Sequence, residues 1–117
     1  MRGAMENLLY PASTLEIAKK REQLAPETLK SWRTFSRQVF ADGALPAKTK
    51  DLIAIAVAHV TQCPYCIRAH TKSALQKGAT EEEIMEAVWV AAEMRAGAAI
   101  AHSALAIDVM KEHAPSE

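Results

Sequence analysis

Residues 46–60 read PAKTKDLIAIAVAHV, and this stretch decides how the chain folds. Pro46 suits the start of a helix, because its missing N–H and fixed φ cost nothing there. Residues 52–58 are apolar on every side of a helix rather than along one stripe. Since such a helix is normally buried all round, the pattern predicts that this segment is the central helix of the molecule.

Helix signals also precede the central segment. Residues 13–23 begin with the sequence of a capping box, in which a serine side chain and a glutamate three positions later bond each other's backbone N–H groups. Residues 26–41 begin with a proline, and Asp42-Gly43 ends them. We therefore predict two helices ahead of the central one.

Three more helices are predicted after it. Thr61-Gln62 interrupts the chain, and a helix then runs from Pro64 to about Lys77, where Gly78 closes it.

A second capping box, Thr80 to Glu83, begins an amphipathic helix. Its apolar residues recur at helical spacing; they are Ile84, Ala87, Val88, Ala91 and Ala92. Residues 95–97 are expected to bend or end this helix, and an alanine-rich helix follows over residues 98–111. With no alternating strand pattern, the fold class predicted is all-α, about six helices.

The length and composition limit the function classes. A chain of 117 residues indicates one domain, residues 1–117. Lys plus Arg and Asp plus Glu are both 14, so the formal net charge is zero and a nucleic-acid partner is not expected. The longest apolar run is too short to cross a membrane, and we see no signal peptide. We expect a cytoplasmic protein that forms a homo-oligomer, since neutral apolar-rich proteins tend to associate.

Chemistry is concentrated in residues 63–70, Cys-Pro-Tyr-Cys-Ile-Arg-Ala-His. Helical spacing stacks Cys63, Cys66 and His70 on one face. The backbone N–H groups and dipole at the helix start favour a thiolate, and His70 can accept or relay a proton. We expect a lowered pKa at Cys66, greater exposure at Cys63, and a redox-active thiol pair in which Cys66 is oxidised and Cys63 resolves it.

Three stretches resemble a known family: residues 48–54, residues 63–70 and residues 78–84, the last reading Gly-Ala-Thr-Glu-Glu-Glu-Ile. The likeness spans roughly residues 40–107 and is to the AhpD-like alkylhydroperoxidase branch of the carboxymuconolactone decarboxylase family. It implies an all-helical fold, trimers or hexamers, and reduction of a hydroperoxide by the thiol pair, with an external dithiol or thiol protein as reductant. It implies neither a cofactor nor a metal.

Roles for single residues follow from this resemblance. Cys66 matches the cysteine that is oxidised to sulfenic acid, Cys63 its resolving partner, and His70 the histidine of a proton relay. Asp51 stands where the family relay has a glutamate, one methylene longer. Tyr65 stands where the best-studied members have a histidine.

Other interpretations of these residues remain open. Cys63, Cys66 and His70 could be zinc ligands in a binding or scaffolding module, although a structural zinc takes four ligands. A decarboxylase-type lyase acting through a histidine is the other alternative, and it does not need two thiols. His59 fits a partner of the helix dipole better than a catalytic group.

Overall fold

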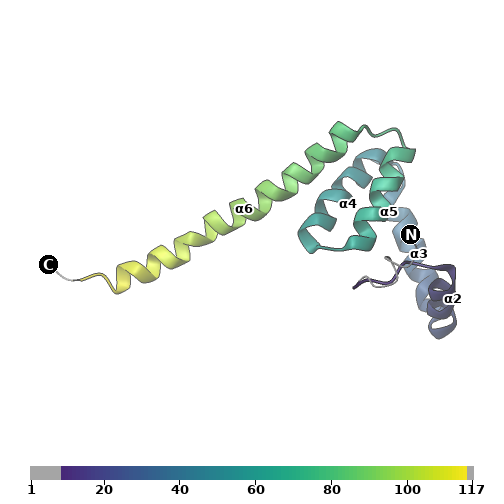
Figure 1. The fold of residues 1–117 in the computed structure, drawn as a ribbon, viewed down its shortest axis with the longest axis horizontal. Coiled ribbons are helices and arrows are strands. Elements are labelled where there is room, and N and C mark those ends of the chain that lie inside the picture. The colour runs from purple at the N-terminus through teal and green to yellow at the C-terminus, as the bar shows by residue number, and fades with distance from the viewer. Residues whose placement is uncertain (1–8, 116–117) are drawn as a thin grey trace. The chain divides into compact units, whose positions relative to one another are not determined.

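The computed structural model describes residues 9–115, which contain five helices and no strand (Figure 1). The all-helical class predicted from the sequence is thereby confirmed, with five helices in this range where about six were expected. Contacts along the chain divide it between Ala41 and Asp42 into two compact units, each described by itself below. The expectation of a single domain stays a prediction.

The first unit holds α2, Leu15–Leu24, and α3, Pro26–Phe40, which pack against each other. Helix α2 starts one residue later than its sequence suggests: the Thr14 hydroxyl accepts the Ile17 N–H at 3.2 Å. The capping box expected from residue 13 is therefore wrong, although the helix that it announced is present.

Helix α3 begins at its proline as predicted but ends before Asp42-Gly43. Asp42 serves the following helix instead, since its Oδ1 atom accepts the Ala47 N–H at 2.7 Å. Among the residues described, Gly78 is the glycine with positive φ, so Gly43 does not take the left-handed conformation of a helix-ending glycine.

The second unit consists of α4, Ala47–Thr61, α5, Pro64–Gln76, and α6, Glu81–Glu112. Helix α4 packs against both α5 and the first part of α6, so its central place within this unit is confirmed (Figure 1). The core is small: Ile55, Ala74 and Ala79 are buried. The partly buried side chains around them are Leu52, Ile84 and Val88.

Burial of α4 on all sides was the wrong expectation. Its buried residues lie on one face and are Asp51, Ile55 and Ala58. On another face Ile53, Val57 and Val60 are exposed to 47%, 53% and 41%. Helix α4 therefore keeps an apolar surface that neither α5 nor α6 covers.

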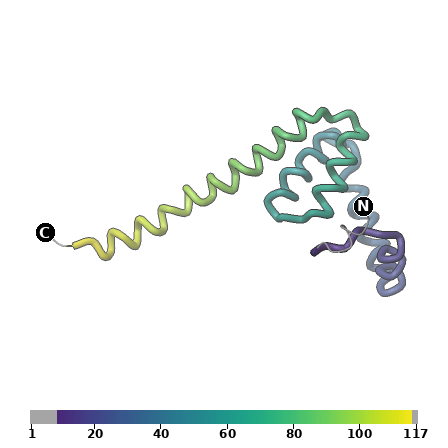
Figure 2. Tube along the Cα trace, in the orientation of Figure 1, coloured from purple at the N-terminus to yellow at the C-terminus, as the bar shows by residue number. Residues whose placement is uncertain are grey.

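The chain from Glu81 to Glu112 forms one uninterrupted helix, so the break expected near Gly97 is also wrong (Figure 2). A glycine inside a helix costs only about 0.5–1 kcal/mol relative to alanine, and neighbouring alanines favour the helix strongly enough to continue it. Its start agrees with the prediction, because Thr80 and Glu83 form both hydrogen bonds of the capping box. No helix within residues 9–115 combines the length and apolarity needed to span a membrane.

Candidate functional site

A sharp turn between α4 and α5 places the first cysteine. Gln62 ends α4 in the left-handed conformation, with φ of +60°. The Cys63 N–H then donates to the Ala58 carbonyl at 3.1 Å. Arg95 of α6 donates from Nη1 to the Val60 carbonyl at 2.7 Å, which ties the end of α4 to the long helix.

Cys63 is the N-cap residue of α5, as the position of Pro64 predicts. Its Sγ atom accepts the Cys66 N–H at 3.2 Å, so the sulfur occupies the place of the usual capping oxygen. The Sγ atoms of Cys63 and Cys66 are 2.7 Å apart and share a hydrogen bond. Both cysteines are free thiols, close enough to form a disulfide with little movement of the backbone.

The two sulfurs differ in acidity. Hydrogen bonds from the Cys66 side chain, the Cys66 backbone and the Tyr65 backbone lower the pKa of Cys63. The same sulfur–sulfur contact raises the pKa of Cys66, with smaller contributions from burial and from the charge on Cys63. In the reduced pair, Cys63 is therefore the more acidic thiol and Cys66 the less acidic one.

Two expectations for this pair are corrected by the structure. A lowered pKa was expected at Cys66, but it is the pKa of Cys63 that is lowered, first by the hydrogen bond with the Cys66 side chain and then by the backbone N–H groups at the cap. Greater exposure was expected at Cys63, yet Cys63 is half-buried and Cys66 is exposed. The turn at Gln62 brings the Cys63 backbone N–H back to the Ala58 carbonyl of α4.

A second cluster surrounds Asp51, which is 1% exposed although it carries a carboxylate. Its Oδ1 atom lies 2.9 Å from Nδ1 of His70. Its Oδ2 atom accepts the Ser73 hydroxyl at 2.7 Å and Nζ of Lys77 at 2.5 Å. Nζ of Lys77 also donates to the Ser73 hydroxyl oxygen at 2.6 Å.

These contacts decide the charge on Asp51. Burial by itself raises the pKa of a carboxyl group, but the hydrogen bonds from Lys77, His70 and Ser73 and the charge of Lys77 outweigh it. The net result is a lowered pKa, so Asp51 is ionised at neutral pH. The buried anion is thus compensated within α4 and α5.

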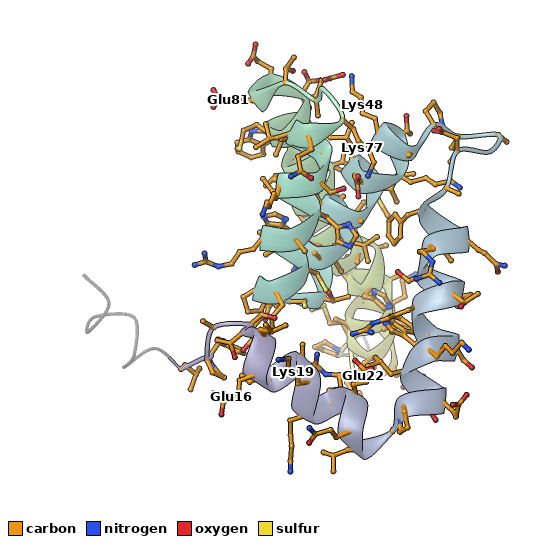
Figure 3. The ribbon with its side chains drawn as sticks, turned by 90° about the vertical axis from the view of Figure 1, so that its right-hand side faces the viewer. Glu16, Lys19, Glu22, Lys48, Lys77 and Glu81 are labelled. Carbon is orange, nitrogen blue, oxygen red and sulfur yellow. The ribbon has the colours of Figure 1, made fainter. Side chains whose placement is uncertain are left out.

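The Asp51 cluster lies at the end of this unit where α4 begins and α5 ends. Figure 3 shows Lys48 and Lys77 at this end, together with Glu81 of α6. Lys48 forms an ion pair with Glu83 at 3.0 Å, which ties the start of α4 to the first turn of α6. Hydrogen bonds from the Thr80 backbone and Lys48 lower the pKa of Glu83.

The predicted site residues thus form two pairs, Cys63 with Cys66 and Asp51 with His70. Helix α5 connects them, because His70 follows Cys66 by four residues and so by about one turn. Ser73 and Lys77 were not predicted as part of this site. Their spacing of three and seven residues from His70 puts them on the same helix face and would have identified them.

His59 lies apart from this chemistry in its contacts. Its Nδ1 atom lies 2.7 Å from the Ile55 carbonyl of the same helix, which agrees with a structural role. Among residues 9–115, no group of three or more His, Cys, Asp or Glu side chains is placed to hold a metal ion.

Known proteins are similar to this chain over most of its length. The model of the carboxymuconolactone decarboxylase family matches residues 26–108. "Uncharacterized protein 4 in cox locus" of Paracoccus denitrificans is 66% identical over 77 residues, which are 66% of this chain and 69% of that protein.

Solved structures agree. A protein from Methanobacterium thermoautotrophicum is 39% identical, with a TM-score of 0.67 over 73% of this chain and 94% of its own. A carboxymuconolactone decarboxylase family protein from Legionella pneumophila is 34% identical, with a TM-score of 0.64 over 86% of this chain and 88% of its own. A family member from Thermotoga maritima is 32% identical, with a TM-score of 0.56 over 73% of this chain and 88% of its own. That protein is described as having a possible involvement in an antioxidative response. Because the family model covers more than half of its length and solved members share its helical arrangement, the chain belongs to the carboxymuconolactone decarboxylase family.

Proposed function

We propose that this protein is a thiol-dependent peroxidase of the AhpD-like branch, which reduces hydroperoxides with the electrons of Cys63 and Cys66. The observation that carries the proposal is the pair of free sulfurs 2.7 Å apart at the start of α5. The contact lowers the pKa of Cys63 and raises that of Cys66, which favours Cys63 as the nucleophile. The antioxidative role suggested for the Thermotoga maritima protein points the same way.

The first step is attack on the peroxide. The Cys63 thiolate attacks the terminal peroxide oxygen, the O–O bond breaks, and the sulfur becomes a sulfenic acid. His70 takes the proton of Cys66, directly or through one water, and passes it to the leaving alkoxide, so an alcohol departs and Cys66 becomes the thiolate. This order differs from the family resemblance, which assigns the oxidised sulfur to Cys66, and it follows the acidity of the two groups.

The second step closes the disulfide. The Cys66 thiolate attacks the sulfenic sulfur of Cys63, and the hydroxide that leaves takes a proton from the solvent to become water. In the preceding step His70, oriented by Asp51, is suited to the proton transfer because it follows Cys66 by one helical turn. An external dithiol then reduces the disulfide, and we propose the cytoplasm as the compartment that supplies it.

The test is peroxide consumption by the purified protein with several candidate dithiols. Wild-type protein should consume hydrogen peroxide or an alkyl hydroperoxide catalytically, and Cys63→Ser and Cys66→Ser should each abolish turnover. Turnover that persists in Cys63→Ser/Cys66→Ser would contradict the proposal. Stoichiometric zinc in the purified protein would favour the metal-binding alternative.

A lyase of the decarboxylase type is the second candidate, because the family as a whole bears that name. The buried Asp51 and its partner His70 could handle a proton without either thiol. Decarboxylation of a lactone carboxylate by the double cysteine variant, lost in His70→Ala, would favour the lyase over the peroxidase.

A further inference from the structure

The side chains of Ser73 and Lys77 contact Asp51 on the side away from His70. Both donate to Oδ2 of the carboxylate, at 2.7 Å and 2.5 Å, while His70 uses Oδ1. His70 and Ser73 belong to α5, Lys77 is the residue that follows its last turn, and the acceptor comes from α4. Together they leave no acceptor oxygen of the buried carboxylate without a partner.

Lys77 differs from Ser73 in carrying a full charge. A buried carboxylate beside an imidazole favours the protonated, cationic ring, because the two then form an ion pair. Here a lysine ammonium already neutralises Asp51. His70 then has no need to supply the countercharge.

The position of Asp51 also selects the tautomer of the ring. A neutral histidine carries its proton on one ring nitrogen and accepts with the other. Because the carboxylate is the acceptor at Nδ1, the proton belongs there and Nε2 becomes the basic atom. A neutral ring with this tautomer is the form that can take a proton from a thiol.

We propose that Lys77 is a positioning residue of the relay. It neutralises Asp51 and thereby keeps His70 as a neutral imidazole, protonated at Nδ1 and basic at Nε2. Ser73 fixes the carboxylate and the ammonium relative to each other but does not set the charge. The inference rests on the proposed function only in naming Cys66 as the group whose proton His70 receives.

The test reads the state of His70 without peroxide or reductant. In protein labelled with ¹⁵N in its histidines, the ring nitrogens of His70 should give the shifts of the neutral Nδ1–H form at pH 7.5. Lys77→Met keeps most of the apolar stem and removes the charge. It should convert at least half of His70 to the doubly protonated ring, while Lys77→Arg should keep the wild-type pattern.

Matched variants separate charge from packing. Lys72→Met removes an exposed lysine from the same helix and should leave the His70 signals unchanged. Ser73→Ala should keep the ring neutral. His59 and His102 bond carbonyls of their own helices and serve as internal reports of intact folding.

The inference is overturned by a wild-type His70 pattern in Lys77→Met, or by an equal change in Ser73→Ala. If Lys77→Met changes the His59 and His102 signals, that variant is misfolded and Lys77→Arg becomes the test. A doubly protonated His70 in Lys77→Arg then overturns the inference, and a neutral His70 supports it. None of these measurements uses peroxide. A lack of peroxidase activity can therefore be distinguished from a wrong assignment of the role of Lys77.

Discussion

Two sulfur atoms of the same residue type acquire opposite properties through their places on one helix. The contact between the two sulfur atoms lowers the pKa of Cys63 and raises that of Cys66, and Cys63 at the cap also accepts a backbone N–H group. Thiolate character, and not the mere presence of a thiol, decides nucleophilic reactivity. We therefore expect the two cysteines to differ in the pH at which they react and in their rate of reaction with peroxide.

In the reduced wild-type protein, Cys63 should be alkylated at a lower pH than Cys66. The pKa of Cys63 is lowered and that of Cys66 is raised, so iodoacetamide should label Cys63 first as the pH increases. Peptide mass spectrometry at a series of pH values measures both midpoints. Equal midpoints, or an earlier one at Cys66, would contradict the assignment of the thiolate.

Trapping of the sulfenic acid tests the same assignment under oxidation. In Cys66→Ser, one equivalent of peroxide should leave a sulfenic acid on Cys63 that dimedone traps, because no thiol remains to resolve it. In Cys63→Ser the adduct at Cys66 should form at least about tenfold more slowly, since that sulfur lacks the cap donors. Faster labelling of Cys66 would restore the order implied by the family resemblance.

Asp51 should contribute stability that depends on pH. Its folded pKa is lowered, so the contribution is complete above the ordinary value of 3.8 and is lost as the pH falls through the lowered value. At pH 7, Asp51→Asn should cost about 2 kcal/mol in unfolding free energy, because charged hydrogen bonds are lost. Urea unfolding at several pH values should show this difference shrinking below pH 3.8, and a constant difference would refute the linkage.

The helices as elements obey local rules at their starts and less so at their interiors. Thr80 and Glu83 close the capping box of α6, and Gly78, with φ of +90°, ends α5. Gly97 has ordinary helical geometry and does not interrupt α6. The two glycines should therefore respond oppositely to a methyl group.

Gly97→Ala should raise the unfolding free energy by about 0.5–1 kcal/mol, because alanine favours the helix. The added Cβ atom would meet the flexible Glu93 side chain at 3.4 Å, which can move aside. Gly78→Ala is the matched control and should destabilise the protein by about 1 kcal/mol, since its left-handed backbone strains any residue with a Cβ atom. Urea denaturation midpoints measure both, and a loss of stability in Gly97→Ala would contradict the account of α6.

At the scale of the whole molecule, the exposed apolar surface is large. An open groove of about 520 Å³ lies between α4 and α6. Its lining residues are Ala56, Val57, Val60, Val90, Ala91, Met94, Arg95 and Ala98. Contiguous apolar surface of this kind is typical of an interface between proteins.

We therefore expect association of identical chains, as a homotrimer or homohexamer. Light scattering at micromolar concentration should give a mass that is three or six times 12.8 kDa. Val57→Glu should lower that mass, because it puts a charge on the groove, and Leu75→Glu, at an exposed apolar position outside the groove lining, should not. A monomer mass for the wild-type protein would rule the expectation out.

Local sequence signals were enough to predict the starts of α3, α5 and α6 and to place the thiols at the start of α5. Prolines, capping side chains and a left-handed glycine act within a few residues, so Pro26, Pro64 and the Thr80 capping box could be interpreted without a tertiary structure. The register of Cys63, Cys66 and His70 is equally local, because all three lie on or beside α5.

The contacts of these residues with distant parts of the chain could not be predicted from local sequence and are known from the tertiary structure. Asp51 finds partners 19 to 26 positions away, and no local rule predicts which donors will meet a buried carboxylate. The acidity of the sulfurs depends on the N–H groups at the cap and on the contact between the two sulfur atoms. The exposed face of α4 depends on where α5 and α6 pack. An apolar composition predicts that a helix is buried, but it does not predict which of its faces other helices cover.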